Sequence, residues 1–409
     1  MNETLEILKS RGFLQQCTGI DALSEKMNSG SVNFYVGIDP TGGSIHIGHM
    51  VPVFAMKHLV NAGHKGVLLL GGGTSRIGDP SGKTETRKML DYDELDANTE
   101  KIISQLKFFI SKDRADIKNV SFENNKEWLK DLNYIDFLRD IGSHFSVNRM
   151  LTFEAYKKRM ETGLSFLEFN YQLLQSYDFL MLHQKYNCTL QIGGADQWGN
   201  IVAGADLIRR KTGKEVFGLT FPLLTTADGK KMGKTENGAL FLDPDLVSPY
   251  EFFQYWRNVD DRDVKKYLLI FTFLGIPEIE EILAGHINTA KEKLAFEVTK
   301  IVHGKQEAEK ALAGAKAAFS GGGNLDAMPT TNLEKTKFNE GLNIVELFFQ
   351  AGLCGTKSDA RRLVQQGGAY VNDECIKDIK ANLNSSSLNV DGELILRAGK
   401  KRFMRVITE

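Results

Sequence analysis

Two histidines three residues apart, His46 and His49, stand where an extended segment gives way to a helical pattern. Side chains at this spacing occupy neighbouring positions of a helix and can point the same way. The start of a helix exposes unpaired backbone N–H groups and the positive end of its dipole, which favour anions. With the hydroxyl of Thr41, the two imidazoles could therefore bind a polyphosphate, while Gly48 would let a nucleotide approach closely. Surface histidines or part of a metal site are the alternatives, although two ligands are too few for a metal and no third is nearby in sequence.

The segment Gly78–Thr84 (GDPSGKT) has the composition of a phosphate-binding P-loop. That motif requires four residues between its glycines, and only three separate Gly78 from Gly82. We therefore exclude a P-loop but keep Lys83 and Arg87 as candidate contacts to a phosphate or carboxylate. The alternative is a turn with exposed charges, and for Arg87 the two interpretations are equally supported.

A cluster of lysines surrounds Gly233 in the segment KKMGKT, which begins at Lys230. A cationic loop of this kind suits the negative charge that develops on a departing pyrophosphate. Lys231 and Lys234 are the candidate contacts. Taken alone, the segment is more typical of a solvated lysine turn.

Three polar residues, Tyr171, Gln175 and Asp178, form one stripe on an otherwise apolar helical segment. If the helix is buried, these side chains need polar partners. The alternative is that the stripe faces solvent. Shortly afterwards a predicted strand ends in glycines, including Gly194, and is followed by Asp196 at the start of a helix, an arrangement typical of a ribose-hydroxyl site.

Strands that alternate with helices must position these groups. The sequence predicts a first helix over residues 3–16, further helices over 46–61 and 197–211, and strands over 32–38, 66–70, 188–192 and 218–224. This alternation predicts an α/β fold with a parallel sheet and helices on both faces. Ligands of such sheets bind at the carboxyl ends of the strands, where the glycine-rich loops fall.

The second half of the chain has a different pattern. Residues 248–312 predict several helices, including an amphipathic one over 291–302, and a glycine-rich polar segment over 320–331 is typical of a linker. From residue 342 two helices and then short strands are predicted.

Bulk properties limit the class of protein. A chain of 409 residues exceeds the usual size of one domain, and a net charge of -1 excludes a generally basic nucleic-acid binder, so any RNA contact must come from local patches. The four cysteines form no CxxC pair, which argues against disulfides and a structural zinc site. The N-terminal segment has no apolar signal core and no apolar run reaches membrane-spanning length, so we expect a cytoplasmic protein.

In combination the motifs resemble the class I aminoacyl-tRNA synthetases, and within them the bacterial-type tyrosyl-tRNA synthetases. Residues 46–49 read HIGH, and residues 231–235 (KMGKT) match the family's KMSKS segment, with Gly233 and Thr235 in place of its serines. The tyrosyl branch is indicated by YVGIDPT at 35–41, GDPSGKT at 78–84, YxxxQxxD at 171–178 and GGADQWGN at 193–200. The resemblance covers nearly the whole chain.

The resemblance implies a role for each matching residue. Tyr35 and Asp178 would bind the phenol of the substrate tyrosine, and the rest of the amino-acid pocket would comprise Asp39, Asp79, Tyr171, Gln175 and Gln197. The adenosine and ribose would contact Gly37, His49, Gly194 and Asp196. The phosphates would be bound by Thr41, His46, Lys83, Arg87, Lys231 and Lys234. Val36 replaces a side chain that touches the ribose in some relatives, which leaves that contact in doubt.

The implied activity is the formation of tyrosyl-adenylate and pyrophosphate from tyrosine and ATP, followed by transfer of tyrosine to the 3′ end of tRNA. ATP would be a substrate that carries magnesium, and no permanently bound metal or organic cofactor is expected. The implied domains are a Rossmann-like catalytic domain (1–247), a helical anticodon-side domain (248–320), a linker (321–341) and an S-four-like RNA-binding module (342–409). That module would contact tRNA through Arg361, Arg362, Lys400, Lys401 and Arg402, and the family implies a homodimer.

Two other functions are compatible with parts of the pattern. A tryptophanyl-tRNA synthetase would share the nucleotide motifs, but Tyr35, Asp178 and the C-terminal module favour the tyrosyl enzyme. An RNA-binding protein with an inactive synthetase fold is disfavoured because the HIGH segment, KMGKT and the polar stripe are intact.

Overall fold

The computed structural model of the chain describes residues 1–81, 90–111, 117–229, 232–235, 238–320, 329–389, 391–399 and 402–409. These residues divide into two compact units. The first comprises Met1–Asp243 and Arg262–Glu281, and the second comprises Pro244–Asp261 and Ile282–Glu409. None of the helices in the described ranges combines the length and the apolar character needed to cross a membrane.

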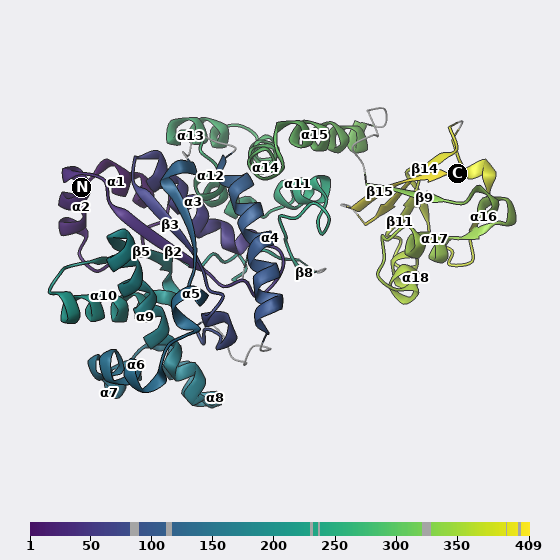
Figure 1. The fold of residues 1–409 in the computed structure, drawn as a ribbon. Coiled ribbons are helices and arrows are strands. Elements are labelled where there is room, and N and C mark those ends of the chain that lie inside the picture. Colours follow the sequence, from purple (N-terminus) through teal and green to yellow (C-terminus); the bar gives the residue numbers. More distant parts are fainter. Residues whose placement is uncertain are drawn as a thin grey trace. The chain divides into compact units, whose positions relative to one another are not determined.

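A six-stranded sheet forms the centre of the first unit, with the strand order β1-β6-β5-β2-β3-β4 (Figure 1). Strands β2 to β6 pair in parallel, and the short β1 pairs antiparallel with β6 at one edge. The bounds are Gln16–Cys17 (β1), Asn33–Ile38 (β2), Lys65–Leu70 (β3), Val120–Asn124 (β4), Cys188–Gly194 (β5) and Phe217–Phe221 (β6). The four strands predicted from the sequence all form, although the last ends earlier than expected, and the predicted parallel α/β sheet is confirmed.

Helices cover both faces of this sheet, as neighbouring residues of β2 show. Tyr35 packs against Phe179 of helix α9, with ring centroids 5.1 Å apart. The preceding residue, Phe34, lies beside Gly66 of β3 and shares that face with Met56 of helix α3. Because successive side chains of a strand point to opposite faces, α9 and α3 lie on opposite sides of the sheet.

Among the helices of the first unit, those predicted over residues 46–61 and 197–211 form as α3 and α10. The bounds of the helices in this unit are Glu3–Ser10 (α1), Ile20–Ser29 (α2), Ile47–Asn61 (α3), Tyr92–Ser111 (α4), Lys126–Leu129 (α5), Tyr134–Asp140 (α6), Val147–Met150 (α7), Glu154–Thr162 (α8), Phe166–Tyr186 (α9), Trp198–Thr212 (α10), Val264–Phe271 (α12) and Ile276–Ala284 (α13). The prediction of one helix over residues 3–16 is wrong beyond Ser10. Gly12 has a φ of +87°, which ends the helix, and Gln16–Cys17 pairs with β6 instead.

The first part of the second unit is helical and includes Pro249–Arg257 (α11), Ile287–His303 (α14) and Lys305–Ser320 (α15). Helix α11 packs against both α14 and α15. Together with α12 and α13, they account for the several helices that the sequence predicted over residues 248–312. Residues 321–328, which include the glycines of the expected linker, lie outside the described residues.

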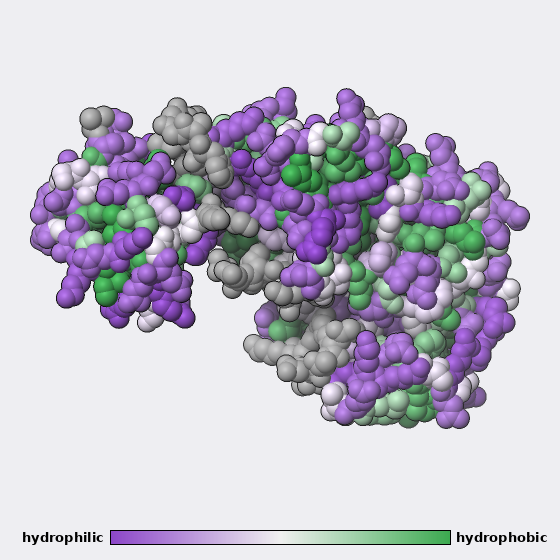
Figure 2. All heavy atoms as spheres, turned by 180° about the vertical axis from the view of Figure 1, so that it is seen from behind, coloured by the Kyte–Doolittle hydropathy of each residue, from purple (hydrophilic) through white to green (hydrophobic). Residues whose placement is uncertain are grey.

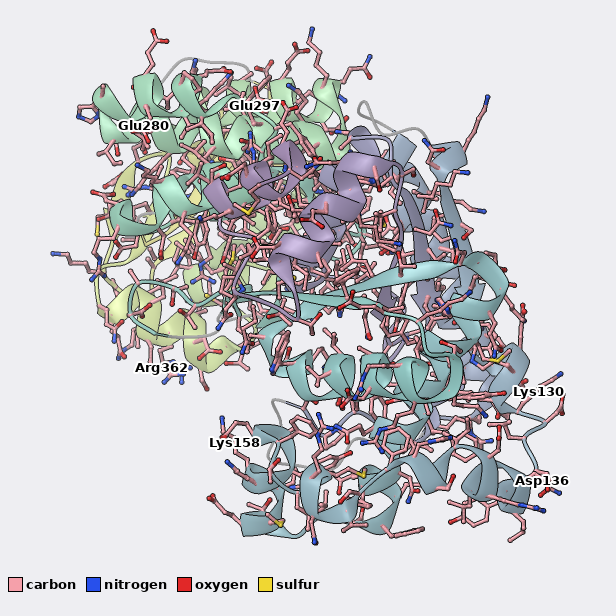
Figure 3. The ribbon with its side chains drawn as sticks, turned by 90° about the vertical axis from the view of Figure 1, so that its left-hand side faces the viewer. Lys130, Asp136, Lys158, Glu280, Glu297 and Arg362 are labelled. Atoms are coloured by element: carbon pink, nitrogen blue, oxygen red, sulfur yellow. The ribbon has the colours of Figure 1, made fainter. Side chains whose placement is uncertain are left out.

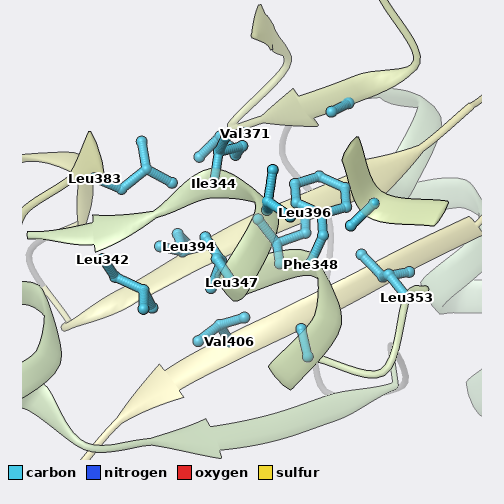
Figure 4. Close-up of a cluster of buried hydrophobic side chains, with 14 of the residues drawn as sticks. Leu342, Ile344, Leu347, Phe348, Leu353, Val371, Leu383, Leu394, Leu396 and Val406 are labelled. Atoms are coloured by element: carbon cyan, nitrogen blue, oxygen red, sulfur yellow. The ribbon is translucent and has the colours of Figure 1, made fainter. Parts of the chain in front are cut away.

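The C-terminal part of the second unit has its own apolar core, shown in Figure 4, in which Phe348 and Leu396 are completely buried. Its five-stranded sheet has the order β12-β11-β14-β15-β9. The helices are Lys335–Glu340 (α16), Ile344–Gln350 (α17) and Lys357–Gln365 (α18); the strands are Thr330–Leu333 (β9), Leu342–Asn343 (β10), Ala369–Val371 (β11), Glu374–Ile376 (β12), Asn382–Leu383 (β13), Glu393–Ala398 (β14) and Arg402–Thr408 (β15). From residue 344 onward, α17 and α18 are followed by short strands, as predicted.

The segment expected as a linker, residues 321–341, differs from that expectation in its described part. Thr330–Leu333 forms β9, which pairs in parallel with β15, and α16 follows it. The polar composition of this segment predicted a loop. A strand forms instead because the segment pairs with β15, about 75 residues further along the chain, and a local sequence pattern does not record such a distant contact.

Candidate active site

Tyr35 and Asp178 are buried between strand β2 and helix α9, with 1% and 2% of their surfaces exposed. The Asp178 carboxylate accepts hydrogen bonds from Nδ2 of Asn125 (2.9 Å) and Nε1 of Trp128 (2.7 Å). The Tyr35 hydroxyl is also buried, and it has no hydrogen-bond partner among the residues that the structure describes. Buried hydroxyls are normally paired, so an unpaired one beside a carboxylate is suited to a ligand that brings a hydroxyl group of its own.

Burial controls the protonation of this pair. It raises the pKa of Asp178 to about 7, and the nearby charge of Asp39 raises it as well, while the hydrogen bonds from Asn125 and Trp128 lower it. Burial likewise raises the pKa of Tyr35 well above its ordinary value, and the charge of Asp178 adds to this effect. Tyr35 is therefore protonated at neutral pH and can donate a hydrogen bond.

A series of hydrogen bonds through Asn125 and Thr74 connects Asp178 to Asp39. Nδ2 of Asn125 also donates to Oγ1 of Thr74 (2.9 Å), and that hydroxyl donates to Asp39 (3.4 Å). Oδ1 of Asn125 accepts from the backbone N–H of Gly73 (2.8 Å). Sequence reasoning missed Asn125, Thr74 and Trp128. Asn125 directly follows β4, a strand that the sequence analysis did not predict, so its position gave no signal.

A second polar network joins the other residues expected to bind the amino acid. Nε2 of Gln197 donates to Asp79 (2.6 Å), and Nδ2 of Asn200 donates to Oε1 of Gln175 (3.0 Å) and of Gln197 (3.3 Å). Tyr171 is buried on the same helix as Gln175. The structure thus brings the expected residues together, and the stripe on α9 does not face solvent. Asn200 was missed as a site residue, although it belongs to the GGADQWGN segment.

The two histidines lie at the start of helix α3, where His46 is the N-cap residue. Nδ1 of His46 accepts from the backbone N–H of Gly48 (3.1 Å), and Nδ1 of His49 accepts from the backbone N–H of His46 (3.3 Å). The rings stack with their centroids 3.9 Å apart. Because both Nδ1 atoms accept, the neutral rings carry their protons on Nε2. The arrangement places two imidazole donors at a helix N-terminus, which suits an anion.

The KMGKT segment packs directly against this helix start. Gly233 has a φ of +81°, and a Cβ atom built on it would lie 2.3 Å from Cγ2 of Ile47. The backbone N–H of Leu240 donates to the carbonyl of Gly233 (2.8 Å), and that of Ile47 donates to the carbonyl of Leu240 (2.9 Å). Glycine in place of the family's serine is therefore what this backbone conformation and this close contact require.

Three further residues lie where a nucleotide could bind at the carboxyl ends of the strands. Gly37 is exposed near the end of β2, and a Cβ atom on it would meet no atom within 4 Å. Gly194 ends β5, and Asp196 lies in the turn that leads into α10. Val36 is buried in β2 with 2% of its surface exposed, so its side chain belongs to the core.

The remaining phosphate candidates are only partly described. Thr41 is exposed in the loop after β2, and its backbone N–H donates to the carbonyl of Asp39 (2.9 Å). Lys234 begins the short strand Lys234–Thr235 (β7), which pairs with Gly238–Ala239 (β8), but the description covers its backbone alone. Lys83, Arg87 and Lys231 lie outside the described residues. Within those residues no three His, Cys, Asp or Glu side chains are grouped so that they could hold a metal ion.

The residues expected to contact tRNA lie in the C-terminal module. Arg361 and Arg362 are exposed on α18, and Figure 3 shows Arg362 pointing outward. Arg362 forms an ion pair with Asp359 one turn earlier. NH1 of Arg402 donates to the carbonyl of Leu353 (2.8 Å), so this arginine also has a structural role. Lys400 and Lys401 lie outside the described residues.

Comparison with known proteins places this geometry in a family. The family model described as tRNA synthetases class I (W and Y) matches residues 27–320, and that of the tyrosine–tRNA ligase SYY-like C-terminal domain matches residues 323–406. The tyrosine–tRNA ligase of Treponema denticola is 70% identical over 407 residues and that of Treponema pallidum is 61% identical over 409. These alignments cover 100% of this chain in both cases, and 100% and 99% of the two relatives.

Similar solved structures agree with this family assignment. A C-terminally truncated mitochondrial tyrosyl-tRNA synthetase of Aspergillus nidulans has a TM-score of 0.69 and 31% identity over 77% of this chain and 94% of its own. A tryptophanyl-tRNA synthetase of Encephalitozoon cuniculi has a TM-score of 0.56 and covers 76% of this chain and 89% of its own; at 16% identity it shows a shared fold alone. On the family matches and the full-length identities, this chain belongs to the class I tRNA synthetases for tryptophan and tyrosine and, within them, to the tyrosine–tRNA ligases.

Proposed function

We propose that the chain activates tyrosine with ATP and transfers it to the 3′ end of its tRNA, and that Tyr35 and Asp178 recognise the phenol. The recognition of the phenol is supported by the buried Tyr35 hydroxyl, which has no hydrogen-bond partner within the described part of the chain and lies near a buried carboxylate. A phenol hydroxyl placed between them would accept from Tyr35 and donate to Asp178. The indole of tryptophan has one N–H donor and no acceptor, so it would leave Tyr35 unpaired.

The proposed pocket continues from the phenol towards the reacting carboxylate. Asp79, Tyr171 and Gln175 would bind the α-ammonium group, for which a carboxylate and two oxygen acceptors are suitable partners. Gln197 lies against Asp79 and would contact the substrate carboxylate. That carboxylate is already a nucleophile and attacks the α-phosphate of ATP in line, so the chain has to position the reactants rather than supply a base.

Pyrophosphate departs towards the start of helix α3. We propose that Nε2–H of His46 and His49, the hydroxyl of Thr41 and the lysines Lys231 and Lys234 bind the phosphates, with Lys83 and Arg87. These contacts accelerate the reaction only if they are stronger in the transition state than in bound ATP. Gly37, Gly194 and Asp196 would contact the adenosine. Magnesium would arrive on the ATP phosphates as part of the substrate.

The test of this activity is ATP–pyrophosphate exchange with each amino acid in turn. Exchange that depends on tyrosine and not on tryptophan is the expected result. Exchange with tryptophan alone would contradict the tyrosine assignment, and absence of exchange with every amino acid would indicate an inactive protein.

Transfer to tRNA would involve the C-terminal module through Arg361, Arg362, Lys400, Lys401 and Arg402. Lysine and arginine contacts to phosphates are salt-dependent, so tRNA binding should weaken as salt rises. A bacterial enzyme of this activity works where tRNA is charged for translation, and on that ground we propose a cytoplasmic location.

We also propose that the chain forms a homodimer through the apolar surface of helices α6 and α9. Ile135 and Phe166 have 69% and 70% of their surfaces exposed, and Tyr134 and Leu167 are exposed beside them. A cavity of about 510 Å³ is lined by Tyr134, Phe166, Leu167 and the buried Phe137, among other residues. Figure 2 shows a largely polar molecular surface interrupted by apolar patches, and Figure 3 shows Asp136 of helix α6 pointing outward. A monomer rarely exposes so many large apolar side chains together.

A further inference from the structure

Helix α4 holds the loop that joins strand β2 to the histidine segment. Nδ2 of Asn98 donates to the carbonyl of Pro40 (3.2 Å). Two turns further along the helix, Oε1 of Gln105 accepts from the backbone N–H of Ile45 (3.0 Å) and from the hydroxyl of Ser44 (3.4 Å). Ile45 has only 1% of its surface exposed, so without Gln105 its N–H group would lose a partner that water could not easily replace. Gln105 therefore fixes the backbone immediately before His46.

The other end of the same side chain contacts the segment that follows KMGKT. Nε2 of Gln105 donates to Oδ2 of Asp243 (3.4 Å). The preceding residue, Leu242, donates its backbone N–H to the carbonyl of Ile45 (3.0 Å). The two segments thus pair through their backbones, and Gln105 lies at the end of this pairing with hydrogen bonds to both.

We infer that Gln105 is a positioning residue for tyrosine activation. It couples the histidine segment to the KMGKT segment so that both sets of phosphate contacts act on the same pyrophosphate. This inference rests on the proposed function. A primary amide suits the role because one end accepts from a backbone N–H while the other donates to a carboxylate. Gln105 touches no substrate group, and its effect is on the geometry of residues that do.

Substitution can exchange the donor and the acceptor of the hydrogen bond between Gln105 and Asp243. In Gln105→Glu the carboxylate still accepts from Ile45, but it has no proton to donate and it faces the carboxylate of Asp243. Asp243→Asn restores a donor on the opposite side, so the double variant re-forms the contact in the reverse direction. Gln105→Leu removes all three of these hydrogen bonds at similar volume and cannot be rescued by Asp243→Asn.

Two measurements, the single-turnover rate of adenylate formation and the equilibrium affinity for tyrosine, distinguish a positioning role of Gln105 from a general structural role. We expect Gln105→Glu to slow adenylate formation roughly ten- to hundredfold, because small displacements of catalytic groups have effects of this size, with tyrosine affinity unchanged. The double variant Gln105→Glu/Asp243→Asn should recover most of the rate, and Gln105→Leu/Asp243→Asn should recover none. Asp243→Ala alone should also slow the step, and it tests the bridge even if the Gln105 variants do not fold.

A different pattern would overturn the inference. If Gln105→Glu and Asp243→Asn slow the reaction additively with no rescue, or if Asp243→Ala leaves the rate unchanged, Gln105 does not couple the two segments. A parallel loss of tyrosine affinity would indicate a general structural role. Failure of the proposed function itself is distinguishable, because the unmodified chain would then show no tyrosine-dependent pyrophosphate exchange.

Discussion

At the scale of single residues, Tyr35 and Asp178 are expected to determine selectivity for tyrosine over phenylalanine. Phenylalanine would leave both buried groups without their partner, which costs binding free energy in the transition state. Tyr35→Phe should lower the tyrosine-to-phenylalanine ratio of kcat/KM by about two- to tenfold, and Asp178→Asn by about tenfold or more, because hydrogen bonds to charged groups are stronger.

A matched control is Tyr156→Phe. Tyr156 is equally buried, but its hydroxyl donates to the carbonyl of Phe169 (3.0 Å), so its loss should leave the selectivity ratio unchanged. Steady-state kinetics with both amino acids checks these expectations. Ratios that stay at the original value in both site variants would remove Tyr35 and Asp178 from the phenol site.

Asp178 also predicts a pH dependence of stability. Its pKa is about 7 in the folded chain and has an ordinary value of 3.8, so between these values the folded state binds more protons than the unfolded state. The free energy of unfolding should therefore fall as pH rises through this window, by up to about 1.4 kcal/mol per pH unit. The residue in Asp178→Asn does not titrate and lacks this effect.

Urea unfolding of the original chain and of Asp178→Asn at several pH values from 5 to 8 gives the difference in their free energies of unfolding. This difference isolates the contribution of Asp178, because the contributions of the other titratable groups cancel. The original chain should lose stability relative to the variant from about pH 5 to 7 and level off above that. A difference that is constant over the whole range would mean that Asp178 keeps an ordinary pKa.

At the scale of secondary-structure elements, Gly233 tests the contact between the KMGKT segment and helix α3. Gly233→Ala places a Cβ atom against Ile47 and strains the backbone at positive φ. The rate of adenylate formation should fall about tenfold or more, with tyrosine affinity unchanged. Gly229→Ala is the matched control, because Gly229 has a φ of +79° but no atom within 4 Å of a Cβ. Equal effects of the two variants would assign the loss to backbone strain rather than to the contact.

At the scale of the whole molecule, activation and tRNA charging are expected to be separable. The candidate activation residues all precede Thr235, and the C-terminal module has a separate apolar core. A chain that ends at Ser320 should therefore retain tyrosine-dependent pyrophosphate exchange, while its tRNA charging should fall strongly because phosphate contacts are lost. Charging at the full rate in the same truncated preparation would show that the C-terminal module does not bind tRNA.

The proposed dimer gives another prediction at this scale. Phe166→Asp puts a charge into the exposed apolar surface and should convert the dimer into a monomer, as sedimentation velocity would show. Leu246→Asp is the control, because Leu246 is an exposed apolar residue (58%) outside that surface and its loss should leave the dimer intact. Dimers of Phe166→Asp with unchanged affinity would place the interface elsewhere.

The sequence by itself predicted candidate groups for the chemistry and four strands of the central sheet. The HIGH and KMGKT segments, the polar stripe on α9 and the glycines at strand ends were recognisable because each depends on spacing within a short segment. The parallel sheet followed from alternating strands and helices for the same reason. These features depend on local sequence, and the structure confirms the parallel sheet and the buried position of the stripe on α9.

Only the tertiary structure decided which polar residues support the site. Asn125 and Gln105 have the same appearance in sequence as any solvated amide, and their partners lie far along the chain. Asn125 and Gly73 are separated by 52 residues, and Gln105 and Ile45 by 60. The pairing of β9 with β15 and the early end of α1 depend on equally distant contacts. A local pattern records whether a residue can form a hydrogen bond, whereas burial and the folded path of the backbone decide with which group it does so.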